Sequence, residues 1–158
     1  LGLIDVDAQA MNSVSSESVG LDGVGGIVTA DAFSTTTGIS ETDFSFADTE
    51  SSISADLSDS TSASATSVFG NVVSSLTSSI KGIFGGDSPN TIENAESINA
   101  IVNEQGFAEA SSVGGTAVTS ADQSAEAISS YDITTSEDLL LQGQSNLSST
   151  TSSSVTEA

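Results

Sequence analysis

The single cationic side chain of this 158-residue chain is Lys81, in the segment SSIKGIFGG. Ser78 and Ser79 precede it by three and two residues, so a nucleophilic serine–lysine pair is the first chemistry to consider. Neither spacing defines a pocket that would bring a hydroxyl to the ammonium group, and serine is abundant along the whole chain. We therefore expect no catalytic role for Lys81.

Other catalytic side chains are scarce. The chain contains no histidine and no cysteine, and its one basic residue is a lysine, so arginine is absent as well. These absences exclude imidazole bases, Ser-His-Asp arrangements, thiolate or imidazole metal sites and bidentate guanidinium clamps. The composition therefore predicts a protein that is not an enzyme and that has no cofactor.

Carboxylates are the one plentiful group, with 22 aspartates and glutamates. Asp5 with Asp7, and Asp43 and Asp48 with Glu41, are spaced closely enough for general acid–base work or for oxygen ligation of a divalent cation. A glycosidase would also need aromatic or basic neighbours, which are few here. We expect these carboxylates to form a solvated surface that allows weak divalent-cation binding.

The net charge of −21 restricts the partners. Nucleic acids and anionic membranes are bound through Lys and Arg, so the sequence predicts neither partner. No run of about 18 apolar residues is present, so we expect no transmembrane segment. A chain this acidic, with few large apolar residues, can build only a thin core of its own, which favours order through contacts with copies of itself or with other subunits.

The elements that would carry such contacts are suggested by apolar residues in steps of three and four from Ile53 to Phe84. This spacing predicts an amphipathic helix over 65–84 that ends at Gly85 and Gly86. Its apolar stripe, together with Lys81, is our predicted assembly interface. The interface residues are Val68, Phe69, Val72, Val73, Leu76, Ile80, Lys81, Ile83 and Phe84.

In that helix Lys81 lies in the last turn, where a cation interacts favourably with the helix dipole. The alternative is an ion pair between Lys81 and a carboxylate of a neighbouring subunit. Both interpretations give the lysine a structural role.

Two further helices are predicted. Asn90 and Glu93 form a capping pattern before a helix over about 91–105, and Ser120 and Gln123 do so before one over about 120–131. A short fourth helix could begin at Ser136. The predicted fold is therefore mainly α, with three to four short amphipathic helices and Ser/Thr/Gly-rich connections. The alternative is an all-β or mixed assembly of short Val/Thr-rich strands, and no repeat with a fixed period of 20–50 residues stands out.

Composition divides the chain into three segments. Residues 1–52 are Gly-rich and acidic, residues 53–144 form the predicted helical region, and residues 145–158 are a Ser/Thr-rich tail that we expect to be disordered unless it docks. The chain starts at Leu1, which favours a processed, secreted product.

The resulting hypothesis is a structural subunit that self-assembles into an extracellular fibre, filament or surface layer. One alternative is an accessory or linker protein that is ordered by partners inside a larger hetero-complex. Another is a secreted segment that acts on membranes through 65–84, although its polar face is serine and not Lys or Arg.

Overall fold

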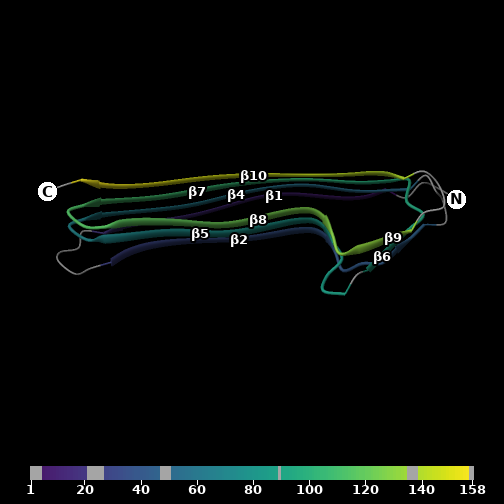
Figure 1. Cartoon of the computed structure of the whole chain (residues 1–158), viewed down its shortest axis with the longest axis horizontal. Coiled ribbons are helices and arrows are strands. Elements are labelled where there is room, and N and C mark those ends of the chain that lie inside the picture. Colours follow the sequence, from purple (N-terminus) through teal and green to yellow (C-terminus); the bar gives the residue numbers. More distant parts are fainter. Residues whose placement is uncertain (1–4, 21–26, 47–50, 89, 135–138, 157–158) are drawn as a thin grey trace.

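The computed structural model describes residues 5–20, 27–46, 51–88, 90–134 and 139–156. All helical or extended structure in this part of the chain is β-strand, and the strands form three parallel sheets (Figure 1). The strands are β1 Asp5–Gly20, β2 Ile27–Ser40, β3 Phe44–Ser45, β4 Ser52–Val68, β5 Asn71–Phe84, β6 Asn90–Glu93, β7 Ser97–Val113, β8 Ala117–Ser129, β9 Tyr131–Thr134 and β10 Leu140–Thr156.

The three sheets arise because the chain winds repeatedly around one axis. Sheet A has the order β1-β4-β7-β10, sheet B the order β2-β5-β8 and sheet C the order β3-β6-β9, so each turn of the chain adds one strand to each sheet. Residues that pair across neighbouring strands are separated by 41 to 48 positions, as for Ser52 with Asp5, Thr116 with Asn71 and Asn146 with Asn103. The fold is a parallel β-solenoid, and we call each turn a rung.

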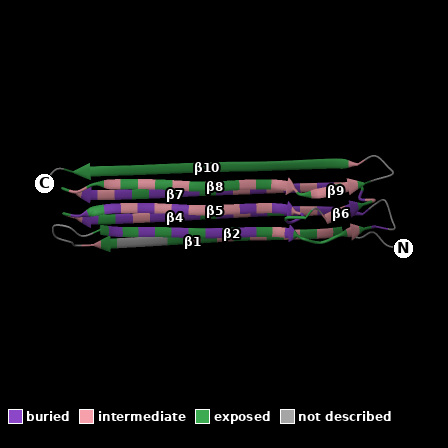
Figure 2. Ribbon diagram, turned by 60° about the horizontal axis from the view of Figure 1, so that its bottom comes forward, coloured by how far each residue is buried: buried purple, intermediate pink, exposed green. Residues whose placement is uncertain are grey.

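Sheets A and B lie against each other as two long layers (Figure 1). Their strands run in opposite directions because the chain reverses at the end of each long strand (Figure 2). The layers are staggered: β2 contacts both β1 and β4, β5 contacts both β4 and β7, and β8 contacts both β7 and β10. β10 begins a fourth rung in sheet A, and sheet B has no fourth strand in the described residues.

Alternation of side chains defines the interior. β2 and β4 alternate between buried and more exposed residues along nearly their whole length, as expected for strands with one face inward (Figure 2). Many inward residues are small, such as Ala63, Ala65, Ala108 and Ala110, all of which are fully buried. Small inward side chains let the two layers approach closely, so a chain with few large apolar residues can still form a dry core.

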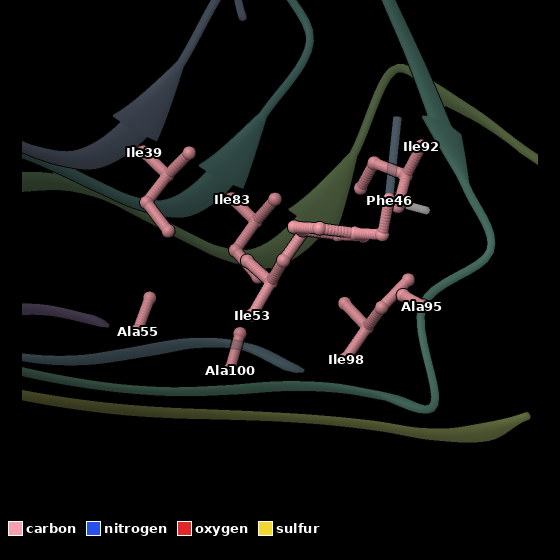
Figure 3. Packing of buried hydrophobic residues seen from close by; sticks show 9 residues of the cluster. All are labelled: Ile39, Phe46, Ile53, Ala55, Ile83, Ile92, Ala95, Ile98 and Ala100. Carbon is pink, nitrogen blue, oxygen red and sulfur yellow. The ribbon is translucent and has the colours of Figure 1, made fainter. Parts of the chain in front are cut away.

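The largest core cluster lies at the end of the layers where sheet C joins them (Figure 3). Ile53 and Ile98 project from sheet A, Ile39 and Ile83 from sheet B, and Ile92 from sheet C. Branched aliphatic side chains suit this position because they fill space well on a pleated surface. This cluster fixes the three sheets to one another.

The corners between strands repeat from rung to rung. Phe69 and Gly114 follow β4 and β7, and both have positive φ angles, of 63° and 75°. Glu41, Gly86 and Ser130 do the same at the corner after sheet B, with φ of 50°, 86° and 58°. Equivalent corners therefore each contain a residue in the left-handed conformation. The sequence does not reveal this structural repeat, because only two of the five residues are glycine.

The mainly α prediction is wrong, and the all-β alternative gives the correct class. The predicted helix over 65–84 is instead the end of β4, a corner at Phe69 and Gly70, and β5. The predicted helices over 91–105 and 120–131 are likewise strands, mostly in β7 and β8. A start at Ser136 lies outside the described residues.

The error has a physical cause. In β5 every second residue from Val72 to Gly82 faces inward, so Ser74 and Ser78 are buried like Leu76. If serine is taken as a surface residue, Ser74 and Ser78 no longer contribute to the alternation. The remaining apolar residues then recur every four positions, a spacing that is typical of one face of a helix. Hydroxyl groups can be buried here because some bond to the backbone, as Ser74 Oγ does to the Ala63 carbonyl oxygen at 2.8 Å.

The Ser/Thr-rich tail is also ordered. Residues up to Thr156 belong to β10, which pairs in parallel with β7 along its full length. The tail expected to be disordered unless it docks therefore docks, as a strand of the same chain.

Candidate functional site: the open end of the solenoid

Assembly requires a surface that can accept another molecule, and β10 provides one. It has a single neighbour, β7, so the backbone groups along its other edge have no strand partner within the described chain. All of its 17 residues are exposed (Figure 2). In a chain with net charge −21, β10 carries no charged residue at all.

The side of β10 that faces the interior is open as well. Its register with β7 identifies the inward residues, because Ile98, Val102 and Glu104 of β7 are buried. Leu141 and Leu147 are inward by this register, yet 51% and 53% of their surface is exposed. The full inward set is Leu141, Gly143, Ser145, Leu147, Ser149, Thr151, Ser153 and Val155.

β8 forms the other half of this end. It lies between β7 and β10 in the opposite layer and is the last strand of sheet B. Its inward residues are only partly buried, and they include Ala117, Ala121 and Ala125. We call the free edges of β8 and β10, with the inward side of β10, the tail face.

The opposite end, formed by the free edges of β1 and β2, is the head face. It differs in charge, because Asp5 and Asp7 lie on β1 and Asp31 on β2. Each of these carboxylates accepts a hydrogen bond from a serine of the next rung: Ser52, Ser54 and Ser75 respectively. The head face is therefore acidic, whereas β10 on the tail face is neutral.

The structure distributes the nine predicted interface residues over several environments. Four of them, Val72, Leu76, Ile80 and Ile83, are core residues of β5 with at most 1% exposure. Val73 and Lys81 point outward from the same strand, and Phe69 is an exposed corner residue. Val68 and Phe84 are half-buried strand ends. The nine residues do not form one stripe, so the open surfaces at the two ends are better candidates for assembly.

Lys81 lies on the outer face of sheet B, in register with Glu126 of β8. Its ammonium nitrogen is 3.9 Å from the centre of the Phe84 ring, a cation–π contact. Ser78 points inward from the same strand, so Ser78 and Lys81 lie on opposite faces. Ser79 shares the outer face with Lys81, and its hydroxyl oxygen accepts a hydrogen bond from Ser124 Oγ at 3.2 Å.

Of the other surface carboxylates singled out from the sequence, Asp43 is hydrogen-bonded to a neighbouring strand. Asp43 accepts hydrogen bonds from the backbone N–H and the hydroxyl of Thr91, at 2.8 and 3.3 Å. Glu41 is a corner residue, and Asp48 lies outside the described residues. Weak cation binding by these groups stays a prediction.

A second feature, which the sequence did not suggest, is a polar layer inside the core. It comprises the inward residues Asn12, Asp59 and Glu104 of sheet A and Ser34, Ser78 and Gln123 of sheet B. It separates the apolar cluster around Leu57 and Ile80 from the one around Leu76 and Ala108.

Hydrogen bonds connect part of this layer. Asn12 Nδ2 donates to Ser34 Oγ at 2.8 Å, and Ser34 Oγ donates to Asp59 Oδ2 at 2.6 Å. In the next rung, burial and, to a lesser extent, the negative charge of Asp59 raise the pKa of Glu104 to about 7, against the opposing effect of the Gln123 amide. Gly106 makes room for Gln123, since a Cβ there would lie 2.3 Å from Gln123 Nε2.

Comparison of the chain with protein-family models, with curated proteins and with solved structures finds no match. Within the described ranges no helix has the length and hydropathy needed to cross a membrane.

Proposed function

We propose that this protein is a non-enzymatic structural subunit that self-assembles through the ends of its solenoid into an extracellular fibre, filament or surface layer. The observation that carries the proposal is β10, a long, uncharged and fully exposed edge strand. Soluble proteins usually protect such edges with charges, prolines, bulges or covering loops, because an open edge pairs readily with another strand.

The stagger of the layers selects how a second copy fits. Sheet A has four strands and sheet B three, so a copy translated along the axis would leave a gap of one strand opposite β10. A copy rotated by 180° about the strand direction exchanges the two layers and fills the gap. The β10 strand of the second copy then lies beside β8 of the first copy. The β8 strand of the second copy lies beside β10 of the first copy. Such an interface is isologous, the commonest type in homo-oligomers.

This arrangement completes both half-rungs at once. The inward sides of the two β10 strands face each other, which buries Leu141, Leu147 and Val155 of each copy. The new strand pairs are antiparallel, because sheets A and B run in opposite directions. Backbone hydrogen bonds supply affinity along the edges, and the apolar contacts exclude water.

Charge distinguishes the two ends. The tail face brings an uncharged β10 beside β8, whose acidic residues in the strand are Asp122 and Glu126. Joining two head faces in the same way places β1, which carries Asp5 and Asp7, alongside β2, which carries Asp31. Repulsion at the head face weakens in salt, where the Debye length falls to about 8 Å at physiological ionic strength. Tail-to-tail dimers should therefore form first, and higher assembly should require salt.

Sedimentation velocity over the micromolar range, at low and at high ionic strength, tests the proposal. We expect a dimer at low salt and larger species at high salt, and electron microscopy of these should show rods with the strand spacing of about 4.8 Å along the rod axis. A chain that stays a compact monomer under both conditions contradicts self-assembly. Assembly only with an added second protein would support the accessory role instead.

A further inference from the structure

The polar layer and Thr61, the next inward residue after Asp59 on β4, contain more buried oxygen atoms than the protein itself satisfies. Six have no hydrogen-bond partner among the described residues and are shielded from solvent. They are Asp59 Oδ1, Thr61 Oγ1, Ser78 Oγ, Glu104 Oε1, Glu104 Oε2 and Gln123 Oε1. Leaving a buried polar atom unpaired costs about 1–3 kcal/mol, so this concentration in one layer requires a reason.

The carboxylates are stacked on neighbouring rungs. Asp59 and Glu104 are directly paired in register, and their residues are 2% and 1% exposed. No arginine or histidine exists in the chain, and Lys81 lies on the outer face of sheet B. Two adjacent buried carboxylates without a cation are strongly unfavourable, so the pair must bind a positive charge or a proton.

Two neutral side chains point to the same place independently of the carboxylates. The Ser78 hydroxyl is unpaired in a residue that is 3% exposed, and Ser78 lies between Ser34 and Gln123 in the inward register of sheet B. Thr61 is 1% exposed and is the next inward residue after Asp59 on β4. A protonated carboxyl pair would not need these extra acceptors, whereas a metal ion uses them as ligands.

We propose that the polar layer binds one calcium ion inside the solenoid, with Asp59 and Glu104 as charged ligands and Thr61, Ser78 and Gln123 as neutral oxygen ligands. Calcium takes six to eight oxygen ligands in flexible geometry, which matches an all-oxygen set of this size. Its two positive charges balance the two carboxylates. Magnesium fits less well, because it keeps several of its waters and requires near-ideal octahedral geometry.

The site differs from the surface carboxylates considered from the sequence. It lies between the layers, without an open path to solvent at the ligand atoms, so the ion would enter as the rungs close during folding. Calcium would then stabilise the native solenoid, because it binds the folded state and not the unfolded chain.

The test uses the full chain refolded from denaturant with calcium chloride or with EDTA and then passed through calcium-free buffer. Metal analysis should find one calcium ion per wild-type chain, and the calcium-refolded protein should melt at a higher temperature than the EDTA sample. Glu104→Gln and Asp59→Asn preserve shape but remove a charged ligand, so each should reduce calcium affinity at least about tenfold. The matched controls Glu109→Gln and Asp56→Asn change exposed acids on the same two strands and should retain the ion.

Glu104→Gln also keeps the test valid if calcium is needed for folding. The neutral amide removes one buried charge, so this variant should fold in EDTA and melt at the same temperature with or without calcium. Absence of retained calcium in the wild type, or equal retention in Glu104→Gln, would overturn the proposal. In the first case the two carboxylates share a proton, and in the second the ion binds only to surface groups.

Discussion

Glu104 of β7 lies directly next to Asp59 of β4 at the same inward position of neighbouring rungs, in the middle of the core. Sequence alone places these residues 45 positions apart, with Glu104 inside a predicted helix and Asp59 outside the predicted helices. The parallel register brings them together as a buried pair of acidic side chains.

In EDTA we expect wild-type stability to fall as pH rises. The pKa of Glu104 is near 7 in the folded protein and near 4.5 ordinarily, so between these values the folded state holds a proton that the unfolded chain has lost. Protonation of Glu104 stabilises the folded state fully below about pH 4.5, and this stabilisation is lost as pH rises through about 7. The free energy of unfolding changes by roughly 3 kcal/mol for this shift. Urea unfolding from pH 5 to pH 8 measures it.

Glu104→Gln should remove this part of the pH dependence and should be more stable than the wild type at pH 8 in EDTA. Glu109→Gln is the control, because Glu109 is an exposed residue of the same strand. Equal pH profiles for wild type and Glu104→Gln would show that Glu104 is not held in a buried acidic pair.

A pair of isoleucines distinguishes the solenoid from a helix. Ile98 is fully buried in the core, whereas Ile101 faces outward three residues later on β7. Ile98→Ala should cost about 2–4 kcal/mol through lost burial and a cavity, and Ile101→Ala less than about 1 kcal/mol. On the predicted helix both would share one apolar face, so similar losses from the two substitutions in urea unfolding would contradict the strand register.

The corner at Phe69 gives a backbone prediction. Phe69 has φ of 63°, a conformation that costs a non-glycine residue about 1–2 kcal/mol, and the equivalent residue of the next rung is Gly114. Since Phe69→Gly and Phe69→Ala both remove the ring, their difference isolates the backbone. Phe69→Gly should be the more stable of the two by about 1 kcal/mol in urea midpoints. A more stable alanine variant would show that this corner is not left-handed.

Some of the fold was accessible from the sequence. The small apolar content predicted a thin core, and the Val/Thr-rich patches supported the all-β alternative. The rung was not found, because the spacing between equivalent residues of sheet A changes from 47 to 45 to 43 along the chain. Inward residues such as Ile53 and Ile98 are identical one rung apart, but Asp59 aligns with Glu104 and Thr61 with Gly106.

The candidate sites were less accessible still. A signal for the tail face exists in the sequence, since Leu140–Thr156 is a long uncharged run in a very acidic chain. The Ser/Thr-rich composition of this run is typical of low-complexity sequence and therefore predicted disorder, because its inward residues are mainly serine and threonine. The polar layer depends on residues from three rungs and two sheets, so no local spacing in the sequence could indicate it.

Sedimentation equilibrium of two matched leucine variants tests the central claim, self-assembly through the tail face, most directly. Leu141 lies on the inward side of β10 and Leu140 on its outward side, and their side chains are 51% and 58% exposed. Leu141→Lys would bury a charge between two copies, so it should abolish the low-salt dimer, whereas Leu140→Lys should dimerise like the wild type. Equal association of the two variants, or a wild type that is monomeric throughout, would contradict the account.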